Sequence, residues 1–429
     1  MVKTDSYVQF EAGKLTYRVV PVTEEIIRMI VSGKEIKEAQ GSLIIEKKEY
    51  PEVDFSAEEN AGSIIVKTVK VCAEINTASG DIIWKHADGS KWLSQKKPEL
   101  TETDVIHYNT GDEEPIINRV KTVDGERNFI QNLKAEKVRT AYRGKLFFTW
   151  KEDEEIHGLG QAEEGIYNYR GHCQYLYQHN MRIPMPVLVS TEGYGILVDC
   201  CSLMTFNDDL KDSYLFLDTV DQIDYYFMGG HTMDEIIHDY RYLTGKAQML
   251  PKWAYGYVQS KEQYYTAKEL LEIVRHYRKI GVPLDCVVQD WNTWDPGNWG
   301  EKILDQKRYG DMKECAEEIH KLNAHTMVSV WPNMNAGGKN HTEFFKTGHL
   351  LYDYATMMLL MKKREKCTGN RHRKDFLTRA LIPGGAIPQN RFPVLTGVVQ
   401  QRESHGKDMS LSAVSTRNIW ILLLPMLLH

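Results

Sequence analysis

The chain has 429 residues, of which 42% are hydrophobic and 26% charged, and its formal net charge at pH 7 is −6. This composition is typical of a soluble globular protein and excludes a wholly disordered, collagen-like or membrane-spanning chain. The length predicts two or three domains, and the negative charge argues against a dedicated nucleic-acid binder.

The sequence predicts a cytoplasmic protein. Its first residues, MVKTDSYVQFEAGKL, contain neither an apolar core nor a small-residue cleavage pattern, so we expect no secretory signal. No run approaches the ~18 apolar residues of a membrane helix, and the apolar stretch near the end is broken by Pro425. The seven cysteines form no CxxC pair. They therefore predict free thiols rather than disulfides or a metal site.

Residues 1–235 predict a β-sandwich. Short alternating or β-branched runs recur there, separated by Asn, Asp and Gly, and they include KLTYRVVPV, GSIIVKTVKVCAEI and QIDYYFM. His157 and the following GLGQ predict a turn. Asp208–Asp209 and Asp221–Asp224 are typical of solvated turn carboxylates.

The pattern changes after residue 232. Thr232 as an N-cap and Gly245 as a stop predict a helix, and we assign residues 236–252 to a linker helix between two domains. Residues 253–356 then alternate strands and helices. Continuous apolar strands in such an alternation predict parallel β/α units, which could belong to a barrel or to an open doubly wound sheet. No glycine-rich loop follows the first strand, which disfavours a dinucleotide site.

A candidate binding site follows the strand LDCVVQDW. In parallel β/α folds, ligands lie at the carboxyl ends of strands, and Asp290 stands at such an end. Three tryptophans accompany it in the same loop, Trp291, Trp294 and Trp299. A carboxylate that accepts bonds from paired hydroxyls, beside aromatic rings, suits a sugar. The alternative is that the tryptophans cap a core and that Asp290 pairs with a backbone amide or an arginine.

Several segments in order resemble glycoside hydrolase family 31, the retaining α-glucosidases and α-xylosidases. They include HGLGQAEEGIYNYRG, LPKWAYGYVQS, the strand ending in QDWNTW, and VSVWPNMNAGG, and they span residues 155–356. The resemblance implies an α+β multidomain protein in which a (β/α)8 barrel follows the N-terminal sandwich. It implies that Asp290 binds sugar hydroxyls and that Trp291 and Trp331 lie near that subsite.

The resemblance further implies an oligosaccharide or small α-glycoside as the partner and no cofactor, metal, nucleic acid or membrane. Full-length relatives are often homo-oligomers. In the family, the nucleophilic aspartate ends the fourth barrel strand and the acid/base aspartate follows later. This chain should reach that strand soon after residue 356, but it continues MMLLMKKREKCTGN. We therefore expect an incomplete barrel, a truncated chain and no catalytic residue in the sequence as printed.

A shifted reading frame accounts for the residues after 356. No tyrosine follows Tyr354, and the last 72 residues hold 12 Lys and Arg against 4 Asp and Glu, while the rest hold 41 against 55. Reading the last base of each codon with the first two bases of the next codon forces Asp from Met357–Met358. Read this way, Thr356 through Thr368 and the first two bases of Gly369 allow YDAFDEEARKMYW directly after the segment YAT. Leu381 to Val399 then allow DSWWCDSTEPFSGPDWGG, a strand of the family's nucleophile type. We predict a single-base deletion near Thr356–Met357, which makes residues 357–429 a poorly ordered tail.

Three functions compete at this stage. The first is an α-glycosidase acting on α-xylosides or α-glucosides, inactive in the printed frame. The second is a non-catalytic carbohydrate-binding or interaction module that keeps Asp290. The third, a nucleic-acid arm formed by the basic tail, lacks aromatic interleaving and a recognisable motif.

Overall fold

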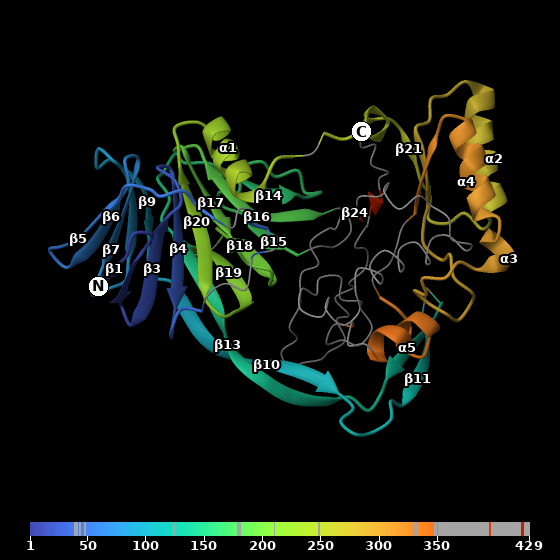
Figure 1. The fold of residues 1–429 in the computed structure, drawn as a ribbon, viewed down its shortest axis with the longest axis horizontal. Coiled ribbons are helices and arrows are strands. Elements are labelled where there is room, and N and C mark those ends of the chain that lie inside the picture. The colour runs from blue at the N-terminus through green and yellow to red at the C-terminus, as the bar shows by residue number, and fades with distance from the viewer. Residues whose placement is uncertain are drawn as a thin grey trace. The chain divides into compact units, whose positions relative to one another are not determined.

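The computed structural model describes residues 1–350 except 38–41, 43, 47–48, 123–124, 178–181, 210, 248, 329–332 and 347–349. It also describes two short strands after these residues, β24 (Val394–Leu395) and β25 (Leu422–Leu423), which pair with one another. Two compact units result, the first comprising Met1–Ile106 and Lys137–Ala247 (Figure 1). The second comprises His107–Glu136 and the described residues after Gln248. The rest of the predicted tail lies outside the described residues.

The first unit is built mainly from antiparallel sheets. One sheet has the order β1-β2-β3-β4-β20-β17-β16-β14. Its strands are β1 (Val2–Lys3), β2 (Val8–Ala12), β3 (Leu15–Pro21), β4 (Ile26–Ser32), β14 (Ile156–Gln161), β16 (Ile183–Ser190), β17 (Tyr194–Val198) and β20 (Ile223–Gly229).

Two five-stranded sheets complete the strands of this unit. The orders are β5-β6-β7-β8-β9 and β10-β13-β19-β18-β15. The strands are β5 (Ser56–Asn60), β6 (Ser63–Lys67), β7 (Val71–Asn76), β8 (Ile82–His86), β9 (Lys91–Gln95), β10 (Glu99–Asn109), β13 (Lys134–Phe148), β15 (Cys173–Leu176), β18 (Met204–Asn207) and β19 (Ser213–Val220).

One apolar core joins these sheets. Strand β3 buries alternate residues, and the fully buried Trp84 of β8 stacks on Phe227 of β20 with ring centroids 4.2 Å apart. Because alternation places every second side chain on one face, sheets of this pattern bury one face in a shared core. The β-rich character predicted for residues 1–235 is therefore confirmed.

Helix α1 (Met233–Thr244) belongs to the first unit. Thr232 and Glu235 form a reciprocal capping box, and Gly245 follows the last turn, so the predicted start and stop are confirmed. Ile236 and Leu243 are fully buried in a core shared with β4, β16, β17 and β20. The unit thus extends to Ala247 and contains the helix that the sequence placed in a linker over residues 236–252.

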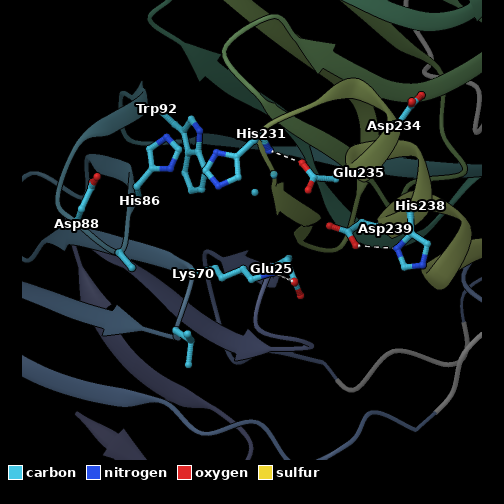
Figure 2. A pocket seen from close by; sticks show the side chains of 14 residues that line it. Glu25, Lys70, His86, Asp88, Trp92, His231, Asp234, Glu235, His238 and Asp239 are labelled. Atoms are coloured by element: carbon cyan, nitrogen blue, oxygen red, sulfur yellow. Dashed lines mark hydrogen bonds and ion pairs between the residues drawn. The ribbon is translucent and has the colours of Figure 1, made fainter.

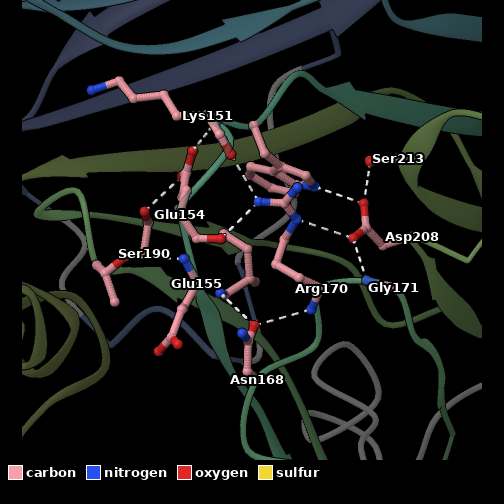
Figure 3. A network of polar contacts seen from close by, with 12 residues as sticks. Lys151, Glu154, Glu155, Asn168, Arg170, Gly171, Ser190, Asp208 and Ser213 are labelled. Carbon is pink, nitrogen blue, oxygen red and sulfur yellow. Dashed lines mark hydrogen bonds and ion pairs between the residues drawn. The ribbon is translucent and has the colours of Figure 1, made fainter.

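The first unit contains a network of polar contacts centred on Asp208 (Figure 3). Asp208, whose side chain is 6% exposed, accepts hydrogen bonds from Trp150 Nε1 (2.9 Å), Arg170 Nε (3.2 Å), the Gly171 amide (2.7 Å) and the Ser213 hydroxyl. The prediction that Asp208 is a solvated turn carboxylate is wrong, because its side chain is buried and is bonded by these donors instead of water. Folding brings the donors to it from 5 to 58 residues away along the chain.

The same prediction is wrong for Asp224. Its side chain is 8% exposed and forms a bidentate ion pair with Arg28, at 2.8 and 2.6 Å. Asp224 lies on β20 and Arg28 on the neighbouring strand β4, where their backbones are two residues out of direct register. A fork-to-fork pair of this kind compensates a charge that burial would otherwise penalise.

Residues 156–161 form strand β14 rather than the predicted turn. Gly158 and Gly160 have φ of 102° and 91°, and the register with β16 shifts between them. A Cβ at Gly160 would lie 2.0 Å from the Ile183 carbonyl oxygen. Position 160 therefore requires glycine. The register shift forms a β-bulge, at which the backbones of β14 and β16 approach closely.

The second unit contains a parallel sheet with the order β21-β22-β23. Helices α2 and α4 pack on one another and share a core with Val287 of β22. The parallel β/α units predicted from the sequence are thus confirmed. The elements are η1 (Lys252–Tyr255), β21 (Val258–Gln259), α2 (Ala267–Ile280), β22 (Cys286–Gln289), α3 (Gln306–Tyr309), α4 (Met312–Lys321), β23 (His325–Val328) and α5 (Lys339–Lys346).

Local signals explain the bounds of α2. Thr266 accepts a bond from the Glu269 amide at its start, and Gly281 ends it in the left-handed conformation. Among the described helices of the chain, none is long and apolar enough to cross a membrane.

Candidate functional site

Strand β22 brings Asp290 to the carboxyl end of the parallel sheet. All four residues of the strand, Cys286–Gln289, are buried, and Asp290 follows directly with 8% of its surface exposed. Its Oδ1 accepts a hydrogen bond from the Trp291 amide at 2.7 Å. Asn292 next adopts a left-handed φ of 65°, which asparagine tolerates better than most residues. The backbone thus turns sharply and holds the carboxylate at the strand end.

Three tryptophans form a cluster beside this carboxylate. The ring centroids of Trp291, Trp294 and Trp299 lie 5.4 to 6.2 Å apart in pairs. Trp294 and Trp299 are 6% and 4% exposed, whereas Trp291 is half-buried. Two of the rings therefore serve as packing for the loop, and Trp291 is the one that can offer a face to a ligand.

Polar contacts fix the far side of the loop. The Asp305 amide donates to the Thr293 carbonyl at 2.8 Å, and Asp305 Oδ2 accepts from Arg308 Nε at 2.7 Å. Arg308 also donates to the Trp294 carbonyl. A loop held at both ends by charge-assisted bonds keeps its side chains preorganised, which a binding site requires.

A buried lysine links this loop to the segment after β23. Lys302 is 6% exposed, and its Nζ donates to the carbonyls of Gly300 and, at 3.2 Å, Asn333. Burial lowers the pKa of Lys302 to about 7, and the charge of Glu301 opposes this only in part. The amine is thus a shared donor for the two strand-end loops rather than a surface charge.

This lysine predicts a pH-dependent stability. The pKa of Lys302 is about 7 in the folded protein and about 10.4 unfolded, so the unfolded chain binds more protons between those values. The free energy of unfolding should therefore rise from pH 7 to pH 9, by up to about 1.4 kcal/mol per pH unit. Lys302→Met should lack this component. Urea unfolding of both proteins at pH 7 and 9 measures it, and a difference between them that is independent of pH would contradict the assignment.

A hairpin from the first third of the chain also meets these loops. Strands β11 (Ile117–Thr122) and β12 (Gly125–Ile130) pair antiparallel within the second unit. Asn335 accepts from the Asn128 amide at 3.1 Å and donates to the Glu126 carbonyl at 3.0 Å, while Arg127 lies over the Trp299 ring at 4.4 Å. The sequence alone does not predict that this hairpin contacts the strand-end loops, because the contacts join residues more than 160 positions apart.

The structure thus brings Asp290 and Trp291 together at one strand end, among the buried Trp294 and Trp299. Trp331, the third residue predicted to bind substrate, lies outside the described residues. The catalytic carboxylates expected beyond residue 356 fall outside them as well.

Comparisons with known proteins agree with the segments that suggested a family. Residues 247–381 match the model of the glycosyl hydrolases family 31 TIM-barrel domain, so the match runs past the predicted frame change. The chain is 36% identical over 225 residues to an alpha-xylosidase of Saccharolobus solfataricus, covering 50% of this chain and 30% of the relative. It is 25% identical over 214 residues to alpha-xylosidase A of Aspergillus niger, covering 49% and 28%. The chain therefore spans about a third of the length of these curated relatives.

Solved structures show the same fold. A GH31 alpha-xylosidase from Xanthomonas citri superposes with a TM-score of 0.66 at 20% identity, covering 86% of this chain and 52% of that one. A GH31 alpha-xylosidase from a soil metagenome, complexed with xylose, gives 0.64 at 21% identity, covering 81% and 49%. These likenesses show the fold, and the sequence matches support a glycoside hydrolase family 31 protein.

Proposed function

We propose that the gene for this chain encodes an α-glycosidase that removes xylose or glucose from the non-reducing end of α-glycosides. The observation that carries the proposal is the buried Asp290 at the end of β22, beside the half-buried ring of Trp291. A carboxylate in such a place accepts bonds from paired sugar hydroxyls, and an aromatic face packs on the pyranose C–H groups. Trp331 is proposed to complete this subsite.

The proposed chemistry is retaining double displacement. It needs a nucleophilic carboxylate and an acid/base carboxylate about 5 Å apart, the first forming a glycosyl-enzyme that water then hydrolyses with help from the second. We propose that both are encoded beyond Thr356 in the shifted frame, the nucleophile as the Asp of CDSTEP. The chain as printed would then bind sugar without hydrolysing it. In this proposal the first unit is the family's β-sandwich and β21–β23 begin its barrel.

The stereochemistry of the product tests this mechanism. We expect the frame-restored protein, mixed with an α-xyloside or α-glucoside, to release the α-anomer of the sugar first, detected by proton NMR before mutarotation. The β-anomer as first product would contradict retention. Sequencing the gene across Thr356–Met357 tests the frame, and an intact frame that encodes the printed tail would refute the deletion.

The alternative function is a non-catalytic carbohydrate-binding module. It is favoured by the same Asp290 subsite and by the absence of a nucleophile strand from the printed frame. Calorimetry with xylose- or glucose-terminated oligosaccharides distinguishes the two. Binding that persists without hydrolysis after frame restoration would support the module.

A further inference from the structure

A cavity of about 520 Å³ lies in the first unit, between helix α1 and the turns that connect β6 to β7 and β8 to β9 (Figure 2). Small-molecule sites typically enclose about 300–1,000 Å³. The cavity is lined entirely by residues 25–239, so it lies outside the segment that matches the family's barrel model. None of its lining residues belongs to the loops around Asp290.

One wall of the cavity is a row of three rings. The ring of His86 lies 3.6 Å from that of Trp92 and stacks on that of His231 at 5.6 Å, with an interplanar angle of 18°. Trp92 is buried, whereas His231 is exposed and ends the row. Burial lowers the pKa of His86, so this ring is neutral at pH 7. The row therefore offers an aromatic face that ends in the exposed ring of His231.

The opposite wall carries an acidic side chain that lacks a full set of partners. Asp239 of α1 is 7% exposed, and Figure 2 shows its carboxylate directed toward the space between His231 and the Lys70–Glu25 ion pair. Its Oδ1 lies 3.5 Å from His238 Nδ1, but its Oδ2 is buried with no hydrogen-bond partner among the described residues. Burial, together with the charge of Glu25, raises the pKa of Asp239 to about 6. Nothing in the described structure neutralises this carboxyl fully.

Trp92, another residue of the lining, also has an unsatisfied polar atom. Trp92 is 2% exposed, and its Nε1 has no hydrogen-bond partner among the described residues. An indole N–H only donates, whereas the free oxygen of Asp239 is an acceptor when ionised. Leaving either group unpaired costs about 1–3 kcal/mol, so both favour a ligand that can supply a donor and an acceptor together.

The charges of the lining exclude two classes of ligand. A single lysine, Lys70, faces five carboxylates, which disfavours phosphates and other anions. Within the described part of the chain, no three His, Cys, Asp or Glu side chains are grouped so as to hold a metal ion. The carboxylates are Glu25, Asp88, Asp234, Glu235 and Asp239.

Two classes remain, organic cations and neutral polyhydroxylated molecules. An ammonium group would satisfy Asp239, but it has no acceptor for Trp92 Nε1. A sugar hydroxyl both donates and accepts, and the C–H face of a sugar ring can pack on the exposed ring of His231. The neutral saccharide therefore fits every feature of the cavity, and the cation fits only the acidic one.

We propose that this cavity is a second saccharide-binding site, separate from the Asp290 subsite, that holds a mono- or disaccharide unit between His231 and Asp239. The proposed role of the site is binding alone, which would help to retain the protein on saccharides.

Calorimetry on the full chain as printed tests the proposal, with maltose and α-xylosyl-(1→6)-glucose as probes. Asp290→Ala removes the strand-end subsite, and we expect this variant still to bind one of the two probes. Adding His231→Ala should weaken that remaining binding at least tenfold, and adding Asp239→Ala should do the same. The control adds His276→Ala to Asp290→Ala, which removes an exposed histidine of α2 rather than one of the cavity. We expect this control to leave the remaining probe binding unchanged.

Thermal melting of each variant shows whether it is folded, and His231 is exposed, so its replacement leaves no core cavity. The proposal is overturned if folded Asp290→Ala binds neither probe, or if the variants at His231 and Asp239 bind as well as the one at His276. Binding of putrescine in place of the sugars would overturn it too, by assigning the cavity to a cation. Failure here leaves the hydrolase proposal intact, because no residue of this cavity takes part in that proposal.

Discussion

In the frame-restored protein, Asp290→Ala is expected to lower kcat/KM for α-xylosides or α-glucosides by about 10²- to 10³-fold. Asp290 is buried at the strand end, where its carboxylate is proposed to accept bonds from two sugar hydroxyls. Removing one partner of a buried, charged hydrogen-bonded pair costs about 2–5 kcal/mol, and each 1.36 kcal/mol is a factor of ten in rate.

The matched control for this prediction is Asp295→Ala. Asp295 is an exposed carboxylate in the same loop, so its removal should change kcat/KM by less than about twofold. Steady-state kinetics with both nitrophenyl glycosides measure the effect, and circular dichroism verifies folding. Equal activity of the two variants would remove Asp290 from the substrate site and favour the interpretation in which the tryptophan loop only caps a core.

The second large effect concerns stability. Asp208→Ala is expected to lower the free energy of unfolding of the first unit by about 3 kcal/mol. The variant leaves Trp150 Nε1, Arg170 Nε and the Gly171 amide without their acceptor. Each hydrogen bond to a charged group contributes about 1.5–3 kcal/mol to stability. The Arg170 side chain is 28% exposed and can bond to water instead, so the loss of free energy of unfolding is smaller than the sum of the three bonds.

Asp209→Ala provides the comparison for that measurement, because Asp209 is the adjacent carboxylate and is exposed. Urea unfolding followed by tryptophan fluorescence measures the change, and Trp150, which bonds to Asp208, is one of the reporting side chains. We expect Asp209→Ala to remain within about 0.5 kcal/mol of the unchanged protein. If the two variants unfold at the same urea concentration, the buried network has no structural role.

The sequence predicted those elements whose signals are local. Thr232 and Gly245 delimit α1 as predicted, because caps act on the backbone within one turn. The continuous apolar run of β22 similarly predicted a buried parallel strand, and Asp290 followed from its position at that strand's end. These features need no knowledge of the rest of the chain.

Features that depend on distant residues were missed or misjudged. Asp208 and Asp224 resemble ordinary turn carboxylates in sequence, and only the donors Arg170 and Arg28, brought in by folding, make them buried partners. The contact of the β11–β12 hairpin with Asn335 has no local signal, since hairpins of polar residues are usually surface turns.

The most direct test of the account compares hydrolysis of nitrophenyl α-xyloside and α-glucoside by the chain as printed and by the frame-restored protein. We propose that the gene encodes a family 31 glycosidase whose catalytic carboxylates are lost to a single-base deletion near Thr356–Met357. This account predicts turnover of at least one glycoside by the restored protein and none by the printed chain. Turnover by the printed chain, or none by a folded restored protein, would contradict it.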